Sequence, residues 1–348
     1  MNTTFKKALT IFIIFAVTVC FAVGMSASVN TTNELAKIKI YITENKIQPQ
    51  TAEETVIFAK TGLIYGDIAE FIPSVDKTDP ESLADMILVL AAIEKTPEEY
   101  AENDFCAVLA GLQQENGSFG GFKETCKAMI ALKATGTVFD STKGAEFIMD
   151  FANENGSICE TDDVFYETYL AVTVLSPYRS TSSAVTETMK KAAEFVKTEF
   201  TSENSAFSPT EIANAIMIIT DLGGDPDEDT YGRLLEKLLN YQNLDGSGTF
   251  YVDDYGKTDR TATVRAMRAL DAVSYGASDL KTLSEMGKFS TGIDLEGLKP
   301  FLTVLAIMAG LSVIMWIIVF AVKKPKTQTL EEYKASVENK QTTSEDEE

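Results

Sequence analysis

One short polar turn recurs along the chain, and this repetition constrains the fold more than any other feature. The turn reads "ENGSF" at residues 115–119, "ENGSI" at 154–158, "ENSAF" at 203–207 and "LDGSGTF" at 244–250. Each copy follows one amphipathic segment and precedes another. A turn repeated between similar segments indicates one structural unit used several times.

The segment after each turn carries a second shared pattern. A threonine is followed by alanine three positions later and by leucine or methionine seven positions later, starting at Thr125, Thr168, Thr210 and Thr263. The threonines are about 43, 42 and 53 residues apart. Positions i, i+3 and i+7 share one face of a helix, so each unit is predicted to be helix, turn, helix. Such units bury their apolar faces only by stacking on one another.

The glycines of the turns have a predicted role. Gly117, Gly156 and Gly246 follow the first amphipathic segment of their units, where we expect helix C-caps in the left-handed backbone conformation. Upstream, helical patterns cover residues 33–46 and 52–65, and another begins at Glu81. In all, residues 29–298 are expected to form about eleven or twelve helices, with no convincing strand.

The repeats resemble a known superfamily. Gln113 or Gln114 with Gly117 and Phe119, and Gln242 with Asp245 and Gly246, are similar to the repeat motif of the α/α toroids. That superfamily includes terpenoid cyclases, protein prenyltransferase β subunits and complement thioester domains. The resemblance covers roughly residues 83–276. It implies an all-α toroid of helical hairpins, with inner and outer helices alternating around a barrel and a cavity at one end.

The chemistry of the superfamily is not carried over with the repeats. The chain has no histidine, which removes the zinc triad of prenyltransferases and the Ser-His-Asp triad of many hydrolases. It also lacks the DxDD motif of class II terpene cyclases and the GCGEQ thioester sequence. Asp253 and Asp254 are paired but do not have the cyclase spacing. We therefore lean toward a non-enzymatic protein without a cofactor.

The two ends of the chain predict export and membrane anchoring. Residues 1–28 carry Lys6 and Lys7, an apolar run and small residues, as a secretory signal peptide does; an uncleaved anchor is the alternative. Residues 300–322 are uncharged and long enough to cross a bilayer, and lysines follow at once, which marks the cytoplasmic side. We expect an extracytoplasmic toroid over residues 29–298, a transmembrane helix over 299–322 and a cytoplasmic tail over 323–348.

The net charge limits which classes of partner the chain can bind, and the cysteine content limits its disulfides. The formal net charge is −22. The two lysines of the signal region offset the two surplus carboxylates of the tail. The exterior part therefore carries the whole formal net charge. Nucleic acid is excluded, because its phosphates require lysine and arginine. Cys106 and Cys126 lie in apolar helical patterns and are expected to be buried; a disulfide between two of Cys106, Cys126 and Cys159 is left open.

Candidate ligand-binding residues lie in the polar linkers before the second helix of each unit. By the resemblance, these linkers lie near the mouth of the cavity, although a solvated rim of carboxylates is the simpler interpretation. The predicted residues are Glu124, Asp162, Asp163, Tyr166, Glu167, Tyr251, Asp253, Asp254, Tyr255 and Asp259. A weaker alternative is a calcium loop, whose ligands would be Asp225, Asp227, Asp229 and Glu236.

Three functional hypotheses follow from the sequence. The first is a single-pass cell-surface protein that binds an unidentified ligand or a cell-envelope partner through the toroid. The second is an enzyme that acts on an isoprenoid or a glycan with paired carboxylates, such as Asp253 and Asp254. The third is a structural component of the cell surface, which would lack a pocket of ligand size.

Overall fold

A computed structural model describes residues 25–64, 75–201, 206–224, 229–253 and 255–290. All regular elements in these ranges are helices, and β pairing is limited to the isolated bridges Ala152–Ile158 and Gln242–Phe250. The predicted all-helical class is therefore confirmed. No helix in the described ranges is long and apolar enough to cross a membrane. The expected signal peptide, transmembrane helix and cytoplasmic tail lie outside the described residues.

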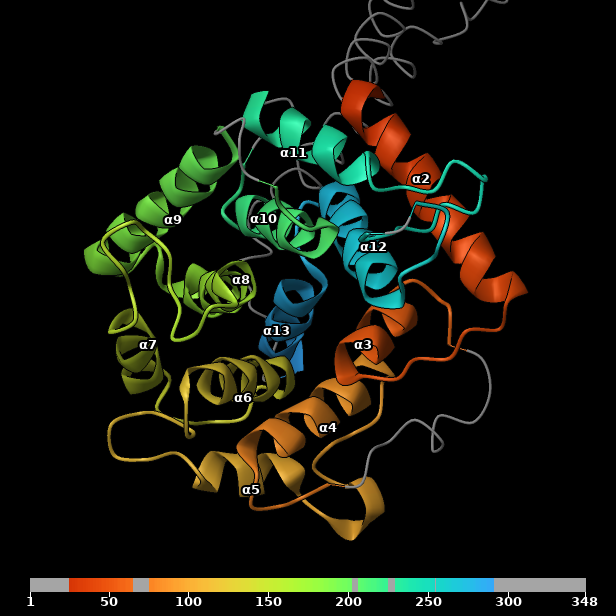
Figure 1. Ribbon diagram of the computed structural model, residues 1–348. Coiled ribbons are helices and arrows are strands. Elements are labelled where there is room, and N and C mark those ends of the chain that lie inside the picture. Colours follow the sequence, from red (N-terminus) through yellow and green to blue (C-terminus); the bar gives the residue numbers. More distant parts are fainter. Residues whose placement is uncertain (1–24, 65–74, 202–205, 225–228, 254, 291–348) are drawn as a thin grey trace, which may run out of the picture. The chain divides into compact units, whose positions relative to one another are not determined.

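The helices form an inner and an outer layer, which alternate along the chain from α4 to α12 (Figure 1). The inner helices are α3 (Ala52–Lys60), α4 (Pro80–Ala92), α6 (Phe122–Thr135), α8 (Val164–Leu175), α10 (Pro209–Asp221) and α12 (Arg260–Tyr275). The outer helices are α2 (Met25–Glu44), α5 (Phe105–Gly111), α7 (Ser141–Met149), α9 (Ser183–Thr201) and α11 (Asp229–Leu239). The last described helix, α13 (Asp279–Ser290), lies within the inner ring in Figure 1 and packs along α6. Short 3₁₀ turns occur at Tyr100–Glu102 and Ser176–Tyr178.

The two layers differ in sequence because they differ in burial. Every residue of α8 from Phe165 to Leu175 is buried, as expected for a helix covered on all sides. Outer helix α9 buries one stripe, which includes Val185, Met189 and Phe200, and exposes the rest. Side chains fix several helix starts; Ser208 and Glu211, for example, form a capping box at α10.

The repeated threonine holds the repeated turn in place. Its hydroxyl accepts a hydrogen bond from the backbone N–H of the last residue of the turn, which is apolar. The N–O distances are 2.9 Å from Phe119 to Thr125 and 3.0 Å from Phe250 to Thr263. Ile158 and Thr168 make the same contact at 3.1 Å. These three turns are thereby tied to the inner helices that follow them.

The turn glycines have left-handed backbones, but they are not helix C-caps. Gly117 has φ +91°, yet helix α5 already ends at Gly111, so the prediction of a C-cap is wrong. The turn instead docks on the next outer helix: a Cβ on Gly117 would lie 2.3 Å from the backbone of Lys143 in α7. Gly156 meets Lys191 of α9 at the same distance. Both glycines are required by close approach as well as by φ.

In the fourth turn, Gly246 has the predicted left-handed backbone, but a different glycine makes the close approach. Gly246 has φ +84° and open space around it, so it makes no close approach. Gly248 takes the docking role, because a Cβ there would lie 2.5 Å from Lys37 Cβ in α2. The last turn therefore docks on the first outer helix and closes the outer layer. The three described cysteines, Cys106, Cys126 and Cys159, are free thiols, which answers the open question of a disulfide.

Candidate functional site

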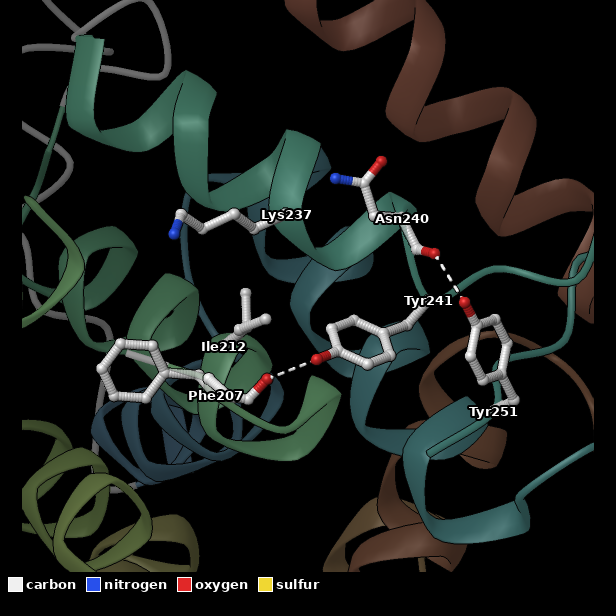
Figure 2. A pocket seen from close by; sticks show the side chains of 7 residues that line it. Phe207, Ile212, Lys237, Asn240, Tyr241 and Tyr251 are labelled. Carbon is white, nitrogen blue, oxygen red and sulfur yellow. Dashed lines mark hydrogen bonds between the residues drawn. The ribbon is translucent and has the colours of Figure 1, made fainter. Parts of the chain in front are cut away.

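A pocket of about 370 Å³ opens beside the start of α10 and the end of α11. We call it the tyrosine pocket (Figure 2). It is lined by Ala206, Phe207, Ile212, Lys237, Asn240, Tyr241 and Tyr251. Its volume lies at the lower end of the range for small-molecule sites, which runs from about 300 to 1,000 Å³. The described lining residues are three aromatic side chains, two aliphatic ones, an asparagine and one cation, and polar atoms form more of the exposed lining than apolar atoms do.

Hydrogen bonds to the backbone hold the two tyrosines of this pocket. The hydroxyl of Tyr241 donates to the carbonyl oxygen of Phe207 at 2.8 Å, and the hydroxyl of Tyr251 donates to that of Asn240 at 3.2 Å (Figure 2). The two tyrosine rings have centroids 5.7 Å apart. The bridge between Gln242 and Phe250 brings Tyr241 and Tyr251 together from the two arms of the fourth turn.

Aromatic neighbours support both sides of the pocket. Phe207 packs on Phe200 and Phe165, with ring centroids 4.1 Å and 5.7 Å away. On the other side, Tyr255 makes an edge contact with Tyr251 at 5.3 Å and is 60% exposed. Phe207 therefore belongs to a packed wall, whereas Tyr255 stands at the solvent edge.

Lys237 is the cationic group of the pocket. It lies in the last turn of α11, and its side chain extends toward the side of Phe207 and Ile212 (Figure 2). A lysine in this position also interacts favourably with the partial negative charge of the helix end. Within the described residues its ammonium group makes no hydrogen bond or ion pair.

A second group of polar side chains lies inside the ring, where sequence reasoning expected an open cavity. We call it the inner polar cluster. Its members come from five inner helices and are Glu53, Glu81, Asp85, Lys127, Tyr166, Arg265 and Arg268. The hydroxyl of Tyr166 in α8 donates to Glu53 in α3. Since α3 and α8 are not neighbours in the ring, this bond crosses the interior (Figure 1).

The charges of this cluster are mutually paired. Arg265 Nη1 lies 2.7 Å from Glu53 Oε2, and Arg268 contacts the same oxygen. Lys127 Nζ lies 2.8 Å from Glu81 and 2.9 Å from Asp85. Burial alone would raise the pKa of Glu53, but Arg265, Arg268 and the Tyr166 hydroxyl outweigh it and lower this pKa to about 2. For Asp85 burial prevails, and its pKa is raised despite Lys127.

The start of α13 is tied to this cluster. The fully buried guanidinium of Arg268 donates to both carboxylate oxygens of Asp279, at 2.7 and 2.9 Å. One residue earlier, the N–H and hydroxyl of Ser278 donate to Asp221 of α10, at 2.8 and 2.7 Å. Helix α13 is thus held to α12 and α10 by buried charge-assisted hydrogen bonds, which are among the stronger ones.

Of the predicted ligand-binding residues that the structure describes, Tyr251 and Tyr255 contact each other beside the tyrosine pocket. Asp253 is exposed in the same loop, and Asp254 lies outside the described residues. Asp162 and Asp163 are exposed before α8, and Glu124 is half-buried at the start of α6.

The remaining three predicted residues have structural partners. Tyr166 belongs to the inner polar cluster, and Asp259 caps α12 by accepting from the N–H of Ala262 at 2.7 Å. Glu167 is buried and accepts from the N–H groups of Glu160 and Thr161, at 2.7 and 2.9 Å. These contacts account for the three side chains as parts of the fold.

The alternative calcium loop falls largely outside the described chain. Asp225 and Asp227 are not described, Asp229 begins α11, and Glu236 is exposed on that helix. In the ranges that the structure covers, no group of three or more cysteine, aspartate or glutamate side chains is placed to hold a metal ion.

Sequence reasoning missed Phe207, Lys237 and Tyr241 as pocket residues. Each lies in an amphipathic segment or beside a turn, where an aromatic or a lysine is explained equally well by packing or by solvation. The available signal was that Tyr241 and Tyr251 stand on the two arms of one repeated turn, which places them side by side.

Comparisons with known proteins find similarity among solved structures only at the level of the fold. No family model matches the chain, and no curated protein does. Among solved structures, the chain is similar to a type II terpene cyclase from Scytonema in complex with its substrate, geranylgeranyl dihydroxybenzoate. The identity is 11% and the TM-score 0.48, over 75% of this chain and 99% of that one. A likeness of this strength assigns no function, so the functional argument rests on the side chains of this chain.

Proposed function

We propose that this chain is a membrane-anchored, extracytoplasmic binding protein whose helical toroid holds a small molecule in the tyrosine pocket. The observation that carries the proposal is the pocket itself: about 370 Å³, with Phe207 on one side, Tyr241 and Tyr251 on the other, and the side chain of Lys237 beside them. Concave sites that combine apolar walls with one or a few polar groups are the usual form of small-molecule sites.

The inside of the ring gives less support to an enzyme that acts on an isoprenoid. Helix α13 lies within the ring, and the charges of the inner polar cluster are paired across it. A hydrocarbon chain placed against Glu53, Arg265 and Lys127 would remove their remaining contact with water without replacing it, which costs free energy. The isoprenoid alternative would therefore need these groups to rearrange.

A purely structural surface component is also less well supported. That hypothesis predicts that a pocket of ligand size is absent, whereas the tyrosine pocket is large enough for a small molecule. Placement outside the cytoplasm rests on the signal-peptide pattern of residues 1–28 and on the apolar, lysine-flanked residues 300–322.

Native mass spectrometry of the full-length protein, purified in detergent from its own membranes, tests this function. We expect a small molecule to remain bound. Ala206→Trp should remove it, because an indole ring at this exposed position would fill the pocket. Ala107→Trp, on an exposed position of α5, is the matched control and should retain it. Equal retention by both variants would move the site away from the tyrosine pocket.

A further inference from the structure

We infer that the tyrosine pocket selects a small aromatic carboxylate, with its ring between Phe207 and Tyr241 and its carboxylate on Lys237. The inference rests on the proposed function and adds the class of ligand. It follows from three properties of the pocket, which are its ring faces, its shortage of free donors and its one cation.

The walls suit a flat apolar body. The hydroxyl of Tyr241 donates a hydrogen bond of 2.8 Å to the backbone carbonyl of Phe207, which fixes the position of Tyr241 in the wall of the pocket. Phe207 is further fixed by its ring contact with Phe200. Aromatic rings favour offset or edge contacts with other rings at centroid distances of about 4.5–7 Å. An aromatic ligand would extend the ring packing that already surrounds the pocket.

The supply of hydrogen-bond donors argues against a sugar. Both tyrosine hydroxyls already donate to backbone carbonyls, so each has only acceptor capacity left. The amide of Asn240 is directed away from Tyr241 (Figure 2). Among the lining side chains that the structure describes, the ammonium group of Lys237 is the one donor that remains toward the pocket. A sugar would bury several hydroxyls with one donor to meet them, and a buried unpaired polar group is costly.

One cation next to aromatic walls suits a ligand with a single negative charge. A hydrogen bond between an ammonium group and a carboxylate is roughly twice as strong as a neutral one. The net charge of −22 by itself disfavours the binding of an anion. However, exposed charges farther away than about 8 Å are largely screened at physiological ionic strength. Lys237 is the one charged side chain among the described residues that line the pocket.

Isothermal titration of the full-length protein with indole-3-acetate and indole-3-acetamide provides the test. The two probes share a ring system and differ in charge. The acid should bind at least about tenfold more tightly than the amide. Lys237→Met should abolish the preference for the acid. It should change the affinity for the amide by no more than about twofold. Lys190→Met, whose side chain is 67% exposed on α9, removes one positive charge elsewhere and should leave the ratio unchanged.

Each other outcome overturns the inference in a recognisable way. Equal affinity for acid and amide in the wild-type protein refutes selection of a carboxylate and leaves the proposed binding function standing. A preference for the acid that survives Lys237→Met places the recognising cation elsewhere. If neither probe binds below about 1 mM, the ligand class is wrong, and the Ala206→Trp experiment then decides the binding function by itself.

Discussion

The guanidinium of Arg260 donates to both carboxylate oxygens of Glu54, with Nε–Oε1 at 3.0 Å and Nη2–Oε2 at 2.5 Å. Arg260 is the first residue of α12, the last helix of the inner ring, and Glu54 belongs to α3, the first. The contact therefore joins the two ends of the ring across 206 residues of sequence. Bidentate pairs of this kind add geometric specificity as well as energy, and this one sets which helices meet where the ring closes.

The turn glycines provide a matched pair for testing how the outer layer is assembled. We expect Gly117→Ala to lower the free energy of unfolding by about 2–5 kcal/mol, because strain at positive φ combines with a clash against the Lys143 backbone. Gly246→Ala should cost only about 1–2 kcal/mol, since it has a similar φ but open space around it. Urea unfolding of both variants measures the difference. Equal losses would show that the turn does not depend on close approach.

Arg268 and Asp279 should be strongly coupled. Arg268→Met leaves buried carboxylates without their partner, and breaking a buried pair typically costs about 3–5 kcal/mol. The double variant with Asp279→Asn should lose about 1–3 kcal/mol less than the two single variants together. A cycle on the exposed pair Lys190 and Glu187, 3.9 Å apart, serves as the control and should show little coupling. Additive losses would mean that α13 is held by packing alone.

The free energy of unfolding should depend on pH in the acid range because Glu53 is ionised in the folded protein. Its pKa is about 2 in the folded protein against an ordinary value of 4.5. Its contribution is therefore fully present above pH 4.5 and is lost as the pH falls toward 2. The difference corresponds to about 3 kcal/mol. Thermal unfolding of the wild type and of Glu53→Gln at pH 7 and pH 3 should show a stability gap that narrows at pH 3. A constant gap would contradict this role for ionised Glu53.

The membrane topology predicted from the sequence can be tested on intact cells. Protease added outside should digest epitopes placed before Lys299 and spare one placed near Glu345. The reason is that residues 300–322 end against lysines, which remain on the cytoplasmic side. Cells permeabilised before digestion are the control and should lose both epitopes. Protection of the large segment in intact cells would reverse the proposed orientation.

The repeated pattern alone was sufficient to predict the helical class, whereas the alternation of two layers was implied by the resemblance to the α/α toroids. Thr125, Thr168 and Thr263 stand at equal registers in helices of equal type, and local helix periodicity determines such registers. The same pattern predicted left-handed glycines correctly at Gly117 and Gly156. It assigned them to helix ends, however, because a sequence does not show how closely the next outer helix approaches.

Only the tertiary structure decided what fills the ring and where a ligand can bind. Glu53 is 215 residues away from Arg268 and looks like a solvated helix charge, yet it contacts Arg268 in the interior, where Arg268 also pairs with Asp279. Phe207 precedes α10, whereas Lys237 and Tyr241 lie at or just after the end of α11, so their convergence depends on the packing of α10 against α11. Local periodicity specifies which face of a helix is apolar. It does not specify which polar side chains face one another, because that depends on contacts between residues distant along the chain.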